Sequence, residues 1–292
     1  MESSVNSELC SRCKKCIEVC PCNVIGTNSE TEVYFIPERT SICLECGQCM
    51  AVCGTKAIKV AGLTYEQHFM DLPDHTVDNT SYLNFLATRR SVRNFKDKPV
   101  ADELIDQILE SVAYAPYGAE PEKINITVVN NRSRIEAALP YMAEFLDNIV
   151  KWMEHPIASR MIRRRRGKEI FNTLKNHLYP IAKLQNYKLE FGDRITRDAP
   201  AIIIFHADLG AEAHTENAMI YATYTMLAAH ALGLGACMVG IVPNAINKVP
   251  ELRDIFGIPE QHEAVMSVII GYPKYTYQRS IIRKKQPVHW LN

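Results

Sequence analysis

Cysteine is the residue whose spacing in this sequence of 292 residues points most directly to chemistry. Nine of the ten cysteines lie between Cys10 and Cys53. Eight of them form two sets with the same spacing, C-x2-C-x2-C-x3-C, and each member of the second set follows its equivalent by 33 residues. Thiolates are the usual ligands of iron–sulfur clusters, and a [4Fe–4S] cube takes four of them. The sets are Cys10, Cys13, Cys16 and Cys20, then Cys43, Cys46, Cys49 and Cys53.

Two other uses of clustered cysteines, disulfide bonds and zinc binding, fit the pattern less well. Disulfides belong to oxidising compartments. The first twenty residues are charged and lack the apolar core of a secretory signal. Structural zinc sites use two pairs of cysteines, which leaves the third cysteine of each set without a role. We therefore expect two [4Fe–4S] clusters.

The order of the cysteines predicts how the clusters share them. In the bacterial two-cluster pattern, C-x2-C-x2-C-x3-C-P, the fourth cysteine of a run binds the other cluster. The first run ends in Cys20-Pro21 and matches in full, whereas the second ends in Cys53-Gly54. Residues 1–62 thus resemble a bacterial-type two-[4Fe–4S] ferredoxin domain, with a packing role for Cys22. The expected ligands are Cys10, Cys13, Cys16 and Cys53 for cluster 1, and Cys20, Cys43, Cys46 and Cys49 for cluster 2.

A second segment, from Thr88 to Phe95, could bind an anion. Its sequence TRRSVRNF holds Arg89, Arg90, Ser91 and Arg93. Guanidinium groups bind phosphate oxygens in a bidentate manner, and a serine hydroxyl adds a donor. The alternative is a basic helix end that faces solvent. The segment alone leaves both possibilities open.

Four segments, taken in order, resemble the nitroreductase family of FMN enzymes. They are RRSVRNF from Arg89, APYGA from Ala115, GLGACMVG from Gly233 and GYPKYTYQRSIIRKK from Gly271. The resemblance covers residues 81–292. It implies FMN as the cofactor and a homodimer with FMN in the interface, so that some residues serve the partner's flavin.

The resemblance also implies a role for each matched residue. It places Arg89, Arg90, Ser91 and Arg283 at the FMN phosphate. It places Arg93 near the pyrimidine edge of the flavin, where a cation favours the anionic reduced form. The other matched residues line the ring: Pro116, Tyr117 and Gly118 along the isoalloxazine, and Val239, Gly240 and Ile241 facing flavin N5.

Residues 120–123 depart from the family pattern. Where the family has Asn and then Gln-Pro, this chain has Glu120, Glu122 and Lys123. An ionised carboxylate only accepts hydrogen bonds, whereas an amide donates and accepts them. We keep Glu120 as a flavin contact. For catalysis, Tyr117 is the candidate proton donor beside solvent.

Hydrophobic periodicity predicts the elements that position these residues. An amphipathic helix is expected over 103–113 and a nearly uncharged, largely buried helix over 215–232. Short apolar strands are expected at 24–25, 57–58, 126–129, 199–205 and 265–270. The fold class is α+β: a nitroreductase-like FMN domain with a mixed sheet and surrounding helices, plus a small bacterial-ferredoxin-like domain.

The predicted domains are a ferredoxin-like domain over 1–62, a polar linker over 63–80 and an FMN domain over 81–292. Residues 151–195 form a charged, helical excursion that could act as a lid. Within it, residues 160–168 carry six basic side chains and no acid. This basic run is either a solvated helix face or a dock for an acidic electron carrier or an anionic substrate.

Charge and hydropathy exclude two classes of protein. Lys and Arg total 33, as do Asp and Glu, so the net charge is zero and a nucleic-acid partner is not expected. The uncharged run 218–242 is interpreted as a buried helix ending at a glycine turn rather than as a membrane span. We expect a cytoplasmic protein of an anaerobic cell.

These predictions combine into an oxidoreductase. Electrons would pass from a ferredoxin-type donor, or NAD(P)H, through two clusters to FMN and on to a nitro, quinone-like or other small aromatic acceptor. The alternatives are an electron-relay protein with a protein partner and no small substrate, an enzyme that consumes FMN, and a redox-sensing flavoprotein.

Overall fold

The computed structural model describes residues 2–29, 31–74, 77–118, 120–184, 190 and 192–291. The chain divides into two compact units, Met1–Val77 and Asp78–Asn292. Ala119 of the predicted ring loop lies outside the described residues, as do residues 185–189 and 191 of the predicted excursion.

The N-terminal unit contains two small antiparallel sheets. In these, β1 pairs with β4, and β2 pairs with β3. The strands predicted at 24–25 and 57–58 are present, each beginning one residue later than expected. The elements are β1 (Ser4–Val5), α1 (Lys15–Glu18), β2 (Ile25–Thr27), β3 (Val33–Phe35), the 3-10 helix η1 (Pro37–Ile42), α2 (Gln48–Ala51), β4 (Ile58–Lys59) and α3 (Tyr65–His68).

The duplication of the cysteine sets extends to the backbone. Helix α2 begins 33 residues after α1, and β4 begins 33 residues after β2. Positive φ angles recur at the same offset: 56° at Arg12 and 50° at Glu45, 62° at Lys14 and 72° at Gly47, 51° at Asn23 and 55° at Lys56. Residues other than glycine adopt such angles only where the surrounding structure requires them. The loops that carry the cysteines therefore have the same backbone shape in both halves.

Residues 63–69, predicted as the start of a linker, pack on the core of the N-terminal unit. Leu63, Tyr65 and Phe69 contact its buried hydrophobic cluster. Gly47 makes room for them, because a Cβ atom there would lie 3.0 Å from Phe69 Cζ. The compact unit consequently extends to Val77, beyond the predicted domain end at residue 62.

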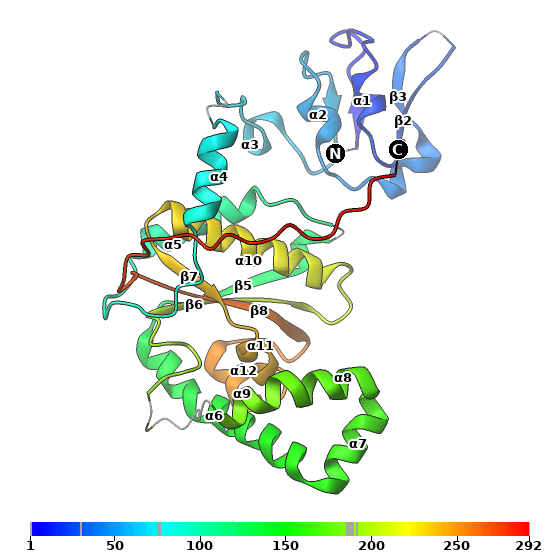
Figure 1. Ribbon diagram of the computed structural model, residues 1–292. Helices are drawn as coiled ribbons and strands as arrows, with labels where there is room; N and C mark the ends of the chain where they lie inside the picture. Colours follow the sequence, from blue (N-terminus) through cyan, green and yellow to red (C-terminus); the bar gives the residue numbers. More distant parts are fainter. Residues whose placement is uncertain are drawn as a thin grey trace. The chain divides into compact units, whose positions relative to one another are not determined.

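The C-terminal unit is a four-stranded sheet between two layers of helices (Figure 1). The strand order is β5 (Ile124–Val129), β6 (Ala201–Asp208), β8 (His262–Gly271) and β7 (Gly235–Met238). Each adjacent pair is antiparallel. The parallel component of the predicted mixed sheet is a single bridge between Ser91 and Ala236. The strands predicted at 126–129, 199–205 and 265–270 are confirmed, with ends that differ by a few residues.

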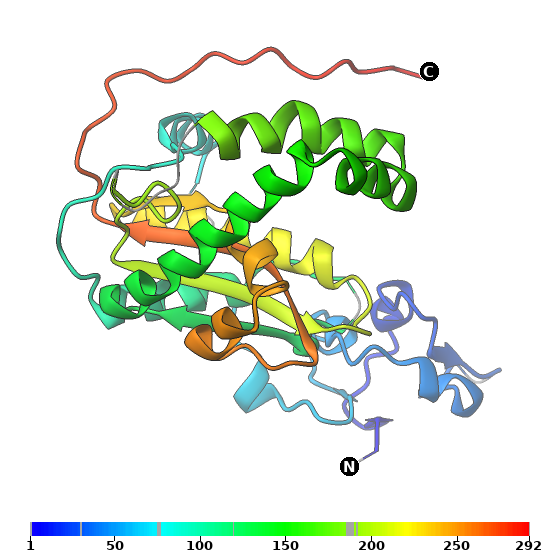
Figure 2. The same ribbon diagram turned by 90° about the horizontal axis from the view of Figure 1, so that it is seen from below.

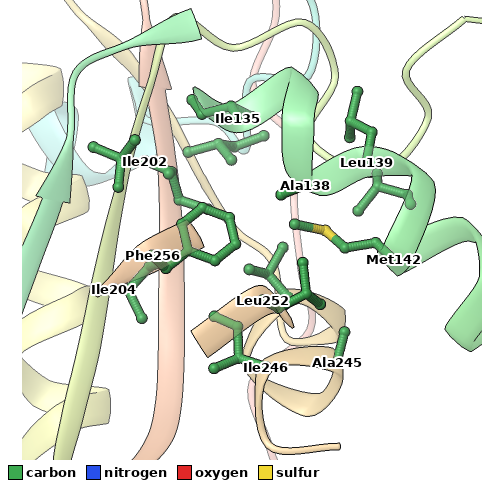
Figure 3. Packing of buried hydrophobic residues seen from close by; sticks show 14 of the residues in the cluster. Ile135, Ala138, Leu139, Met142, Ile202, Ile204, Ala245, Ile246, Leu252 and Phe256 are labelled. Atoms are coloured by element: carbon green, nitrogen blue, oxygen red, sulfur yellow. The ribbon is translucent and has the colours of Figure 1, made fainter. Parts of the chain in front are cut away.

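Helices α5 (Asp102–Ala113) and α10 (His214–Ala231) cover one face of this sheet (Figures 1 and 2). Helices α6 (Arg132–Glu154), α11 (Ile241–Ile246) and α12 (Pro250–Phe256) cover the other. Strand β6 serves both layers because successive side chains point to opposite faces. Ile203 and Phe205 pack toward α10, whereas Ile202 and Ile204 pack with Phe256 in the cluster of Figure 3.

Helix α10 is buried on one side only, which corrects the prediction for 215–232. Its buried residues are mostly small, and this lets the helix lie close to the sheet: Asn217, Ala218, Ala222, Thr225, Ala228 and Ala229. Met219 is 39% exposed. The helix ends before Gly233, whose φ of 75° forms the predicted glycine turn. Within the described part of the chain, no helix is long and apolar enough to cross a membrane.

The predicted excursion is helical from residue 151 to residue 184, with short breaks between the helices, whereas residues 192–195 are not helical. It comprises the end of α6, then α7 (Pro156–Arg166), α8 (Lys168–Thr173), a π-helical turn η3 (Leu174–Leu178) and α9 (Tyr179–Leu184). Helix α9 returns to α6, where Glu154 Oε1 accepts hydrogen bonds from Lys183 Nζ at 2.6 Å and Tyr179 OH at 3.0 Å. Ala182 of α9 belongs to the buried hydrophobic cluster of the C-terminal unit, so α9 also ties the excursion to the core.

A pair of histidines joins β6 and β8. His206 is buried, and its Nδ1 lies 2.7 Å from Nδ1 of His262, while its Nε2 lies 3.0 Å from Thr127 Oγ1. His262 Nε2 lies 3.2 Å from Asp208 Oδ1. Burial, with added repulsion from His262 and Arg253, lowers the pKa of His206 to about 4. A proton on both facing nitrogens would break the pair.

We expect this pair to make the C-terminal unit less stable in acid. The pKa of His206 is lower in the folded than in the unfolded chain, so its contribution is present above pH 6.5 and is lost as the pH falls toward 4. The loss is about 1.4 kcal/mol per pH unit in that window. The measurement is the thermal unfolding midpoint at pH 7.5, 6.5 and 5.5. The unfolding midpoint of His206→Gln should fall less between pH 7.5 and 5.5 than that of the wild type. The midpoint of the exposed control, His289→Gln, should fall as much as that of the wild type. Equal falls in all three proteins would refute this role.

Candidate functional site

The structure brings the eight cysteines together in the two predicted groups. Cys20, Cys43, Cys46 and Cys49 line one small cavity beside Gly47 and Val60. Burial raises the pKa of Cys49 to about 11, and the charges of the other three thiols add to this effect. In the other group, burial raises the pKa of Cys16, and the neighbouring Cys53, Cys10 and Cys13 raise it further. Cys53 therefore joins the first three cysteines and Cys20 joins the second three.

Both crossing cysteines receive the same backbone hydrogen bond. Val24 N donates to Cys20 Sγ at 3.4 Å, and Ala57 N donates to Cys53 Sγ at 3.3 Å. These donors and acceptors are related by the 33-residue offset. Hydrogen bonds to ligating sulfurs are one of the means by which proteins set cluster potentials. The sulfur environment therefore fits the expected clusters.

The thiol groups are not arranged around a single ion. Among the described residues, no three His, Cys, Asp or Glu side chains are placed to hold one metal ion. A four-iron cube has no such requirement, since each thiolate binds a different iron. Cys22 also lines the cavity of the second group and packs against the hydrophobic core of its unit.

The basic segment forms a pocket in the C-terminal unit. Arg89, Arg90, Ser91, Arg93 and Arg283 line it, with a volume of about 310 Å³. Nη1 of Arg89 is buried and has no hydrogen-bond partner among the described residues. A buried guanidinium nitrogen without a partner is costly unless an acceptor arrives from elsewhere. This orphaned donor fits a bound phosphate group.

The C-terminal segment contributes to the same pocket. Ser280 Oγ donates to the carbonyl of Ala87 at 2.7 Å, close to the end of α4 (Asn79–Thr88). The Arg90 guanidinium lies 5.6 Å from the centre of the Tyr277 ring. These contacts bring Arg283 to the arginines that precede it by about 190 residues in the sequence.

Strand β7 fixes the position of the basic segment. Val92 N donates to Ala236 O at 3.1 Å, beside the Ser91–Ala236 bridge. Gly235 is essential to this approach, because a Cβ atom there would lie 2.7 Å from Val92 Cβ. The glycine of the GLGACMVG motif therefore serves close packing.

The other end of β7 carries the segment predicted to face flavin N5. Val239 N donates to Ser267 O at 2.9 Å, and Ser267 Oγ donates to Val239 O at 2.7 Å. Asn244 Nδ2 donates to Gly240 O at 2.9 Å as α11 begins at Ile241. Gly240 follows Ala236 by four residues, which spans at most about 13 Å along an extended chain. One strand thus links the arginine pocket to the predicted ring site.

The predicted ring loop lies elsewhere in the chain's own fold. Gly118 N donates to Asn217 Oδ1 at 2.7 Å, near the start of α10. Thr88 Oγ1, next to Arg89, lies 3.0 Å from His230 Nε2, near the end of α10. Helical rise over the residues between Asn217 and His230 separates these points by about 20 Å. A single chain therefore does not bring Pro116, Tyr117 and Gly118 beside Arg89.

Glu120 has internal partners for both of its carboxylate oxygens. Oε1 is paired with Lys123 Nζ, and Oε2 accepts from Glu212 N at 2.8 Å. The hydrogen bond from Lys123, with the one from Glu212 N, lowers the pKa of Glu120. The ionised carboxylate thus anchors the loop in which the Glu120 φ is 52°. The predicted flavin contact of Glu120 stays a prediction.

Three supporting residues were missed from the sequence. Asn217 and Ser267 are buried polar residues that hold Gly118 and Val239. Tyr65 packs on the N-terminal core, and burial, with the nearby Cys53 and Cys49, raises its pKa to about 12. For Asn217 the available signal was an amide side chain at the start of a nearly uncharged helix. For Ser267 it was a hydroxyl in an apolar strand.

The two units together define a redox protein. One carries two groups of four thiols, and the other has a cationic pocket at the edge of a sheet enclosed by helices. Residues 86–272 match the family model described as "Nitroreductase family", and residues 9–68 match that of a "4Fe-4S dicluster domain". The chain belongs to the nitroreductase family and carries an N-terminal 4Fe-4S dicluster domain.

Relatives and neighbours agree with this assignment. A protein of Methanothermobacter thermautotrophicus named "Putative NADH dehydrogenase/NAD(P)H nitroreductase" is 28% identical over 205 residues, 68% of this chain and 81% of that protein. "FMN reductase [NAD(P)H]" of Bacillus subtilis is 24% identical over 207 residues, 71% and 70% of the two chains. A nitroreductase structure from Desulfitobacterium hafniense, 22% identical, shares the fold with a TM-score of 0.51 and covers 72% of this chain and 97% of its own.

The grouping of the cysteines predicts the iron content of variants. Cys53→Ser removes the crossing ligand of cluster 1 and should lower bound iron by about half. Cys22→Ser should leave it unchanged, because this cysteine belongs to neither group. Iron and acid-labile sulfide per chain, measured after anaerobic purification, test both. Iron loss in Cys22→Ser with none in Cys53→Ser would show that the groups are wrongly assigned.

Proposed function

We propose that this chain is an oxidoreductase that takes electrons from a ferredoxin-type donor and delivers them to a nitro, quinone or related acceptor. When bound, the two clusters would supply one-electron transfer, and FMN would supply two-electron reduction. The observation that carries this proposal is the buried Nη1 of Arg89, which has no partner among the described residues, in a pocket lined by four arginines and two serines. The same chain holds two groups of four thiols.

In this proposal the arginine pocket binds the FMN phosphate. Arg89 offers its buried donor, and Arg90, Ser91 and Arg283 line the same pocket. Arg93 is held near Ser91, with its Nη1 3.4 Å from the Ser91 carbonyl, and would reach the pyrimidine edge. Val239, Gly240 and Ile241, fixed by Ser267 and Asn244, would present backbone groups to flavin N5.

The proposed assembly is a homodimer. The roughly 20 Å of α10 between the arginine pocket and Gly118 supports a site completed by two chains. In that arrangement, Pro116, Tyr117 and Gly118 of one chain would lie along the flavin held by the other. Tyr117 is 51% exposed in the single chain, so its hydroxyl is free to reach such a site as a proton donor. The unoxidised thiols suit a reducing cytoplasm.

The N-terminal clusters favour a one-electron donor. The names of two relatives include NAD(P)H, and a nicotinamide could reduce a flavin without any cluster. Two clusters in the same chain suit the transfer of single electrons, which a ferredoxin-type donor supplies. We therefore favour a reduced ferredoxin-type protein over NAD(P)H as the electron donor.

A second candidate is an electron-relay protein without a small substrate. The exposed arginines of α7 favour it, since a cluster of cations steers an acidic protein partner. Neutralising these arginines would then abolish electron transfer to a protein acceptor and spare transfer to a small dye.

Arg89→Ala tests the phosphate site. Loss of a charge-assisted hydrogen bond costs about 1.5–3 kcal/mol, so FMN should bind at least tenfold more weakly. The exposed Arg134→Ala is the matched control and should retain FMN. Flavin fluorescence after ultrafiltration gives the dissociation constant. Equal FMN affinity in Arg89→Ala and the control would remove the pocket from the flavin site.

The donor is tested by anaerobic stopped-flow reduction, followed as bleaching of the flavin absorbance. We expect reduced bacterial ferredoxin to bleach the wild type rapidly and NADPH to do so slowly. Cys13→Ser, which lacks a ligand of cluster 1, should lose the ferredoxin reaction while keeping its FMN. Fast reduction by NADPH that is unaffected by Cys13→Ser, with none by ferredoxin, would contradict the proposed donor.

A further inference from the structure

A cavity of about 760 Å³ lies between the excursion and the core of the C-terminal unit. Helix α6 forms one wall, α7 and η3 form another, and the start of α11 closes it. Most of its surface is apolar and comes from Phe145, Ile149, Trp152, Ile162, Leu174 and Leu178. Its volume falls within the range of small-molecule sites, about 300–1,000 Å³.

The cavity reaches the segment assigned to the flavin. Ile241 lines it and is one of the three residues proposed to face flavin N5. Asn244, which fixes the carbonyl of Gly240, also lines it. A molecule in this cavity would therefore contact the same turn that positions the reacting edge of the flavin. The excursion supplies a wall that the sheet and its covering helices alone do not provide.

The aromatic side chains favour a flat ligand. Phe145 and Trp152 both come from α6 and line the cavity. Trp152 is 55% exposed, so part of its ring is open to a molecule in the cavity. Aromatic faces bind planar ring systems by stacking.

The charges favour an anionic group on that ligand. Arg166, the last residue of α7, and Lys248 line the cavity, as do Glu144 and Glu251. These four lining charges cancel. The net charge around the cavity is positive because Arg160 and Arg163–Arg165 add cations and α7 has no acidic residue. Among the described residues, no carboxylate forms an ion pair with any arginine of α7. A guanidinium at the rim matches a carboxylate in a bidentate manner.

We propose that this cavity binds the acceptor, and that the acceptor is a flat, apolar molecule carrying a carboxylate recognised by Arg166. The inference rests on the proposed function. For a nitroarene, the first reduction consumes two electrons and two protons and yields the nitroso compound and water. Two equivalents of the reduced one-electron donor supply the electrons, and solvent supplies the protons.

The test compares 4-nitrobenzoate with nitrobenzene, which differ by the carboxylate. The chain has two tryptophans, Trp152 and Trp290. In a Trp290→Phe background of the oxidised holoprotein, fluorescence therefore reports on Trp152 in the cavity. We expect 4-nitrobenzoate to quench it. Arg166→Gln should raise the dissociation constant of 4-nitrobenzoate about tenfold and leave that of nitrobenzene within twofold.

Arg164→Gln is the matched control, since Arg164 lies on the same helix but does not line the cavity. It removes only a distant charge, so it should change either dissociation constant by less than twofold. Equal weakening by Arg164→Gln and Arg166→Gln, or no change in Arg166→Gln, overturns the proposal. Ile162→Phe, which narrows the cavity without adding a tryptophan, should weaken quenching by both probes, and undiminished quenching would also overturn the proposal.

FMN content and menadione reduction, measured in the same preparations with reduced ferredoxin as donor, separate this proposal from the proposed function. Menadione has no carboxylate, so Arg166→Gln should lower its kcat/KM far less than that of 4-nitrobenzoate. If the parent protein contains FMN and reduces menadione, but Arg166→Gln binds 4-nitrobenzoate as tightly as the parent does, then only the cavity proposal is refuted. Absence of FMN or of menadione reduction in the parent protein refutes the proposed function.

Discussion

The close approach of Val92 to Gly235 is the contact on which the C-terminal site depends. A side chain at Gly235 would occupy the space of Val92, and the Ser91–Ala236 bridge would then not form. That bridge places Arg89, Arg90 and Arg93 at one end of β7, where the C-terminal segment adds Arg283, while Val239 and Gly240 follow the other end of the strand. Packing of the strand in the sheet thus sets the distance between an anion pocket and a backbone turn. The buried donor of Arg89, which has no partner among the described residues, supports the proposal that this pocket binds a group from outside the chain.

The N-terminal unit depends on a repeated backbone rather than on a large core. Left-handed residues recur at the 33-residue offset and give each cysteine run the same loop. The amides of Val24 and Ala57 then meet the two crossing sulfurs in the same way. Because each run lends its fourth thiol to the other group, neither half forms a complete site alone. Residues beyond the cysteines, Leu63, Tyr65 and Phe69, complete the packing.

Sequence reasoning succeeded where periodicity or spacing is strong. The helix at 103–113, the apolar strands and the crossed cysteine groups follow from local patterns. It missed α3, because Leu63, Tyr65 and Phe69 are separated by polar residues and pack on a distant glycine. It predicted more burial of α10 than the structure has. The many alanines make the sequence look apolar, but they let only one side of the helix pack closely on the sheet. One partner of Glu120 is the backbone N–H of Glu212, which is far away in sequence, and no local pattern reveals such a contact.

The central claim is that one chain holds both redox groups, and quantitation of iron, sulfide and FMN after anaerobic purification tests it most directly. The account predicts about eight iron atoms and eight sulfides per chain, together with one FMN. The absorbance spectrum should then show flavin and cluster bands in the same preparation. Eight iron atoms without FMN would contradict the assignment of the arginine pocket and would make the chain an electron-relay protein.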